Sequence, residues 1–84
     1  MYTLIVDCSG FALGYNSLML DTQGQLVSSG PVLSTDEILF AATSHPVTQI
    51  KLAGPTDFCL GLKDDIITRL ATEYKNTTIT VEVM

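Results

Sequence analysis

The chain has 84 residues, enough for one small domain, which we assign to residues 1–84. Apolar residues make up 46% of the chain and charged residues only 15%, a composition typical of folded proteins and not of disordered ones. Nine acidic and four basic residues give a net charge of −5, which disfavours nucleic-acid binding because phosphate contacts need a basic surface. The high apolar content of so small a chain suggests that a protein partner covers part of its surface.

The sequence also indicates where the protein resides. It has no apolar run long enough to span a membrane and no recognisable leader, so we expect a cytoplasmic protein without membrane association. Its two cysteines, Cys8 and Cys59, have neither a CxxC partner nor an adjacent histidine. We expect both to be buried, reduced thiols, with a disulfide or a thiol nucleophile as the alternatives.

The first thirty residues have the pattern of an antiparallel meander. Its expected strands are residues 2–7, 15–21 and 25–29. The first is apolar on both faces, which predicts a strand buried on both faces in the middle of a sheet. Gly24 is suited to the turn before the third strand, and Gly30-Pro31 predicts the end of that strand.

From residue 34 onward the pattern changes to helices that alternate with strands. The first expected helix is capped by Ser34 or Thr35 and stops at His45-Pro46, and a strand over 47–52 follows it. The second expected helix begins either at Thr56, which would cap it, or near Leu62. A strand over 78–84 is the last expected element. The second helix repeats apolar residues at helical spacing: Leu62, Ile66, Ile67, Leu70, Ala71 and Tyr74. Asp65 and Arg69 are expected to pair at i,i+4 on its exposed side. The resulting order is β-β-β-α-β-α-β, an α/β fold with a mixed sheet.

Three short motifs in this order resemble the ribonuclease H-like superfamily. Asp7-Cys8-Ser9 resembles the family's Asp-Gly-Ser motif at the end of the first strand. Residues 37–42 (Glu-Ile-Leu-Phe-Ala-Ala) resemble its first-helix pattern, and Pro55-Thr56-Asp57 resembles the Thr-Asp segment that carries its third acid. Over residues 2–84 the chain resembles a minimal, C-terminally truncated ribonuclease H-type domain, which implies three antiparallel and two parallel strands.

The resemblance implies a divalent-metal-dependent nuclease. Asp7, Glu37 and Asp57 would then be the catalytic residues and the ligands of Mg²⁺ or Mn²⁺, ions that prefer oxygen donors. Each acid also has an ordinary structural role open to it. Asp7 would accept hydrogen bonds from the backbone of Ser9 or Gly10, and Glu37 and Asp57 would be acids in the first turn of a helix.

The sequence also departs from the family. Cys8 stands where the family has glycine, no basic protrusion is visible, and a His-bearing loop and a final helix with a fourth acid are missing. Two functions therefore remain open: a nuclease or nuclease remnant, and a non-catalytic protein-binding or oligomerising module that keeps the fold. In the second, the strand over 78–84 would pair with another chain at an exposed sheet edge, and a homodimer is the expected assembly.

Overall fold

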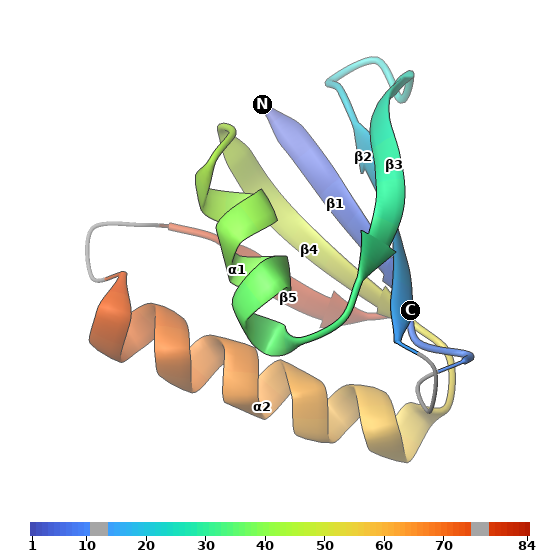
Figure 1. Ribbon diagram of the computed structural model, residues 1–84. Coiled ribbons are helices and arrows are strands. Elements are labelled where there is room, and N and C mark those ends of the chain that lie inside the picture. Colours follow the sequence, from blue (N-terminus) through green and yellow to red (C-terminus); the bar gives the residue numbers. More distant parts are fainter. Residues whose placement is uncertain (11–13, 75–77) are drawn as a thin grey trace.

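The computed structural model describes residues 1–10, 14–74 and 78–84, which form a five-stranded mixed sheet and two helices (Figure 1). In chain order the elements are β1 (Tyr2–Asp7), β2 (Tyr15–Leu20), β3 (Leu26–Val32), α1 (Thr35–Thr43), β4 (Val47–Ala53), α2 (Thr56–Glu73) and β5 (Thr80–Val83). The strand order is β3-β2-β1-β4-β5, with antiparallel pairing from β3 to β1 and parallel pairing from β1 to β5. The predicted element order and the mixed α/β class are confirmed.

The hydrophobic core lies between one face of the sheet and the two helices, which pack on the same side (Figure 1). The register places Leu4 between Met19 and Ile50, and Val6 beside Leu52, and all five side chains are buried. Successive residues of a strand point to opposite faces, so this alternation directs one apolar row of each central strand toward the helices. The helices contribute Ile38, Leu39, Ala42, Cys59, Leu62, Ile66 and Leu70.

The opposite face of the sheet is left uncovered by the described elements. Ile5 and Leu18 are neighbours there, and Leu18 is 43% and Leu26 59% exposed. The prediction that the first strand is buried on both faces is therefore wrong for one face. The strand is central in the sheet, as expected, but Ile5 is only half-buried because neither of the described helices packs against it.

Strand β3 is longer than the sequence predicted. It continues through Gly30 and Pro31 to Val32, with Gly30 opposite Ser17 and Pro31 opposite Asn16. The Ser17 hydroxyl donates a hydrogen bond of 2.9 Å to the Gly30 carbonyl. Pro31 is tolerated because β3 is an edge strand, where a missing N–H need not break a ladder hydrogen bond.

Both helices begin where the sequence predicts, but only α1 is capped by a predicted residue. Ser34 caps α1, as one of the two expected caps, and its hydroxyl accepts a hydrogen bond from the backbone N–H of Glu37. Helix α2 begins at Thr56, but Pro55 occupies the cap position and makes no side-chain hydrogen bond there. Thr56 lies inside the helix, so its predicted capping role is wrong. Neither described helix combines the length and apolar composition needed to cross a membrane.

Arg69 joins the two helices. Its guanidinium forms ion pairs with Glu73 on α2, at 2.7 Å, and with Asp36 on α1. The predicted pair with Asp65 is replaced by these two contacts because Arg69 leans toward α1. Both carboxylates raise the pKa of Arg69 above its ordinary value, Glu73 more than Asp36.

Two glycines provide a matched test of backbone strain. Gly54 follows β4 with φ +131°, and a Cβ there would lie 3.0 Å from backbone atoms of both Cys8 and Ser9. We expect Gly54→Ala to lower the free energy of unfolding by about 1–3 kcal/mol. Gly61→Ala is the control, since Gly61 lies in α2 with open space around it and should gain about 0.5–1 kcal/mol. Urea unfolding of both variants measures this difference, and equal effects would contradict it.

Candidate functional site

The adjacent ends of β1 and β4 form the first candidate site. Asp7 is in register with Ala53, and beyond it the N–H of Cys8 donates a hydrogen bond of 2.7 Å to the Ala53 carbonyl. Gly54 then packs directly against the backbone of Cys8 and Ser9. Sites in α/β folds lie at such carboxyl ends of parallel strands.

Asp7 is exposed at this end and is bound by its own loop. Its Oδ1 accepts a hydrogen bond of 2.9 Å from the backbone N–H of Ser9. This hydrogen bond, helped by the Ser9 side chain, lowers the pKa of Asp7. Asp7 also borders a hollow of about 220 Å³, whose other described lining residues are Gly10, Gly14, Tyr15, Asn16 and Pro31. The loop-capping alternative thus describes what Asp7 does in this structure.

Glu37 holds the connection between β3 and α1. Its Oε2 accepts a hydrogen bond of 2.9 Å from the backbone N–H of Leu33, while its own N–H donates to Ser34. The carboxylate thus satisfies a backbone donor just before the helix, which is the structural role expected of an acid at this position.

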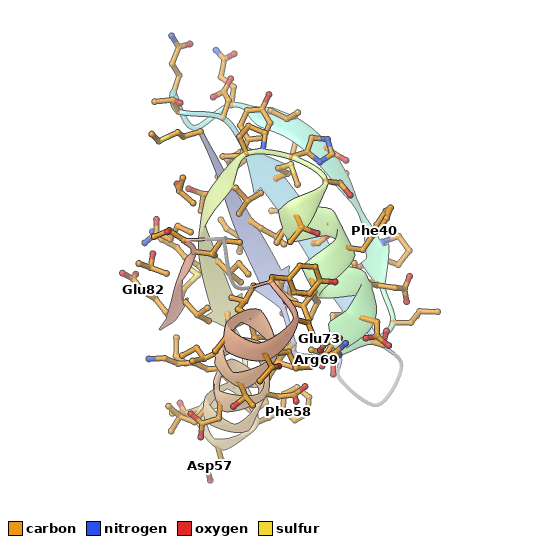
Figure 2. All side chains as sticks on the ribbon, turned by 90° about the vertical axis from the view of Figure 1, so that its left-hand side faces the viewer. Phe40, Asp57, Phe58, Arg69, Glu73 and Glu82 are labelled. Carbon is orange, nitrogen blue, oxygen red and sulfur yellow. The ribbon has the colours of Figure 1, made fainter. Side chains whose placement is uncertain are left out.

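Asp57 lies in the first turn of α2 and is exposed. Figure 2 shows it at the tip of the helix, directed away from the sheet. A negative charge there stabilises the helix through its dipole.

The three predicted ligands do not converge on one point. No group of three or more His, Cys, Asp or Glu side chains that could hold a metal ion occurs within residues 1–10, 14–74 and 78–84. Two of the three predicted carboxylates, those of Asp7 and Glu37, are engaged by backbone N–H groups. This donor set does not fit a two-cation centre, and the catalytic assignment of Asp7, Glu37 and Asp57 stays a prediction from the resemblance.

The two cysteines are fully buried free thiols, in agreement with the sequence-based expectation. Burial raises the pKa of Cys8 to about 12, with smaller effects from the Cys59 thiol and the Asp7 carboxylate. Cys8 is therefore protonated at neutral pH and is a poor nucleophile. Nearby, the ring of Tyr15 lies 5.9 Å from that of Phe58, a contact that fastens the start of α2 to β2.

The second candidate site is the free edge of β5. The N–H of Met84 donates a hydrogen bond of 2.8 Å to the carbonyl of Leu52 in β4. Successive residues of a strand direct their backbone groups to alternate sides, so the N–H and C=O groups of Val81 and Val83 point away from β4. Since β5 is the last strand of the sheet, these groups face the outside.

One flank of α2 lies beside this edge. Phe58 contacts β2 and Arg69 contacts α1, so both lie on the flank turned away from β5, and Figure 2 shows Arg69 and Glu82 on opposite sides of α2. Leu60 and Ile67 occupy the other flank, where they are 48% and 45% exposed.

We call Leu60, Ile67 and the outward backbone groups of Val81 and Val83 the β5-edge surface. The sequence had placed Ile67 in the buried stripe, because Ile66 and Ile67 both fit a helical period. The packing buries Ile66 and exposes Ile67. The i,i+7 spacing of Leu60 and Ile67, which places them on one line along a helix, was the signal in the sequence for this surface.

The turn closed by the hydrogen bond from the Ser9 N–H to the Asp7 carboxylate should change the measured pKa of Asp7. We expect the pKa of Asp7 to lie below its ordinary value of 3.8, since the Ser9 N–H donates to the ionised form. Asp7 then stabilises the folded state above the unfolded-state pKa, and this contribution is lost as the pH falls through the folded-state pKa. Carboxyl-detected NMR titration measures it. Ser9→Ala keeps the backbone donor but loses the hydroxyl, so the pKa of Asp7 should rise only part of the way towards its ordinary value. An ordinary pKa in the unmodified protein would contradict the turn.

The scattered carboxylates also predict the outcome of a metal titration. We expect isothermal titration of Mg²⁺ or Mn²⁺ to give no saturable binding, because Asp7 and Glu37 already accept backbone hydrogen bonds. Asp7→Asn should then behave like the unmodified protein. Saturable binding that disappears in Asp7→Asn would contradict this prediction and support the nuclease assignment.

Comparison with known proteins adds no relative to these observations: no protein-family model and no curated protein matches the chain.

Proposed function

We propose that this chain is a non-catalytic protein-binding module that keeps a ribonuclease H-like fold and pairs with an extended segment of another chain along β5. The strand order β3-β2-β1-β4-β5, with an antiparallel meander followed by two parallel strands, supports the ribonuclease H-like part of the proposal. The β5-edge surface supports the binding part.

The observation that carries the proposal is the combination of backbone and apolar groups at one edge. Within residues 1–10, 14–74 and 78–84 no strand pairs with the outward N–H and C=O groups of Val81 and Val83, and Leu60 and Ile67 offer apolar surface next to them. Added strands bind through backbone hydrogen bonds, each contributing about 0.5–1.5 kcal/mol net, and gain further stability from apolar contacts. The β5-edge surface provides both kinds of interaction to the same added strand.

The other edge of the sheet is less suited to strand addition. β3 contains Pro31, which cannot donate a backbone hydrogen bond, and its pairing with β2 has a register shift between Met19 and Leu20. Proline and irregular pairing are devices that protect edge strands from further pairing. Within the described residues β5 has neither feature.

Charge and donor geometry favour this proposal over a nuclease. A net charge of −5 opposes phosphate binding, and the described carboxylates form no metal-binding group. Strand pairing needs neither a basic surface nor a cation, so the proposed function agrees with both observations.

A peptide with the sequence of residues 78–84 (Thr-Ile-Thr-Val-Glu-Val-Met) tests the proposal. We expect the labelled peptide to bind the protein, as measured by fluorescence anisotropy, and to bind Val83→Pro much more weakly because proline removes an outward N–H. Val83→Ala is the matched control, since it shortens the same side chain but keeps that donor. Equal binding to the proline and alanine variants would contradict pairing along β5, and absence of binding to the unmodified protein would contradict the proposed function.

A further inference from the structure

We infer that the partner bound at the β5-edge surface is a second copy of this chain, joined by antiparallel pairing of the two β5 strands about a twofold axis through Val81. The inference rests on the proposed function and names its partner. The two sheets would continue into one another, with all four helices on the same face.

Side-chain direction restricts the register of such a pair. Val81 and Val83 face the helices, whereas Thr80 and Glu82 face the uncovered side of the sheet. Directly opposite residues in an antiparallel pair share a face, so the helices of both copies lie together only if helix-facing residues oppose helix-facing residues. The axis must then pass through a residue position, and Val81 and Glu82 are the central ones of β5.

The charge of Glu82 and the length of strand overlap both favour a twofold axis at Val81. An axis at Glu82 would set this carboxylate directly opposite its own copy, and like charges in that position are destabilising. An axis at Val81 sets Glu82 opposite Thr80 of the second copy and gives the longest overlap of residues 78–84. It also places Val81 opposite itself and Val83 opposite Ile79, so the outward backbone groups of all three residues form hydrogen bonds.

The same axis brings together the exposed flanks of the two α2 helices. Leu60 and Ile67 are seven residues apart, two helical turns, and so lie on one line along the helix. At 48% and 45% exposure they have apolar surface still to bury, and the second copy presents the same line in the opposite direction. We call this contact between the two α2 flanks the helix seam. Because the line of Leu60 and Ile67 can pack against a copy of itself, a second copy of the chain is the chosen occupant.

The charge distribution permits this contact although each copy carries a net charge of −5. Lys51 lies next to Glu82 in the β4–β5 register. On the α2 flank Lys63 and Asp64 both lie three or four residues from Leu60 and from Ile67, so one basic and one acidic side chain border the apolar line. Acidic Asp7, Asp36 and Glu37 lie on other elements, and Arg69 is held away from β5 by its ion pairs. Two copies therefore meet at a part of the surface where basic and acidic groups are balanced.

Sedimentation velocity between about 1 µM and 1 mM tests the inference. We expect concentration-dependent dimerisation of the unmodified protein. Val83→Pro removes one intermolecular hydrogen bond from each copy and should raise the dimer dissociation constant about thirtyfold or more. Ile67→Glu places a charge in the helix seam and should raise it at least about tenfold.

Phe40→Glu is the matched control for Ile67→Glu. Phe40 is 71% exposed on α1, away from β5, so the variant adds the same charge at another exposed apolar position (Figure 2). It should change the dissociation constant less than about threefold. A dimer that is equally weakened by Phe40→Glu and Ile67→Glu, or is insensitive to Val83→Pro, would overturn the inference.

Amide hydrogen exchange in the unmodified protein tests the same contact without relying on a variant that folds. The N–H groups of Val81 and Val83 should be unprotected at low concentration and protected at high concentration. A strict monomer over the whole range would overturn the homodimer. If that monomer still binds the 78–84 peptide, only the choice of a second copy is wrong; if it does not, the proposed function fails as well.

Discussion

The parallel pairing of β1 with β4 is the contact on which the rest of the structure depends. It joins residues 2–7 to residues 47–53 and so connects the N-terminal meander to the part of the chain that alternates helices and strands. Closing so long a loop is entropically costly, and the contact is stabilised by the burial of Leu4, Val6, Ile50 and Leu52 against the helices. Gly54 then allows the chain to pass close to Cys8 and Ser9 where the paired strands end.

The acidic residues Asp7 and Glu37 form local hydrogen bonds in place of a shared metal centre. Asp7 and Glu37 each accept a backbone N–H that the chain would otherwise leave to solvent, and both do so within a few residues of their own position. Such contacts are short-range and form with the turn or helix start itself. A metal centre would instead require residues from three elements to converge, and the described carboxylates do not do so.

Much of the fold followed from the sequence because apolar periodicity records which face of each element is buried. The strand over residues 2–7 was predicted with its observed bounds, and the helical spacing of Leu62, Ile66 and Leu70 correctly identified three buried positions of α2. Apolar periodicity does not show which strand lies at the edge of the sheet or how a helix is rotated against it. Pro31 reads as the end of a strand unless that strand is known to be at the edge of the sheet, and the choice between Ile66 and Ile67 depends on which way α2 rolls against the sheet.

The candidate site was less predictable than the fold, for a related reason. A sequence shows that Arg69 has acids at helical distance, but it does not show that Asp36 of another helix lies within reach. Likewise the residues of the β5-edge surface are ordinary Leu, Ile and Val residues. Their significance comes from the position of β5 at the end of the strand order, which only the tertiary structure provides.

The two buried thiols give this small domain a built-in reporter of its own opening. Cys8 follows the central strand and Cys59 lies in α2, and both side chains have no solvent exposure. A thiol-specific reagent reaches them only when the helix layer separates from the sheet, so the rate of labelling follows the frequency of that separation. The Cys8 thiol of the sheet layer and the Cys59 thiol of α2 interact directly with each other, so one separation of the two layers exposes both, and unequal labelling rates would mean that α2 opens locally at Cys59.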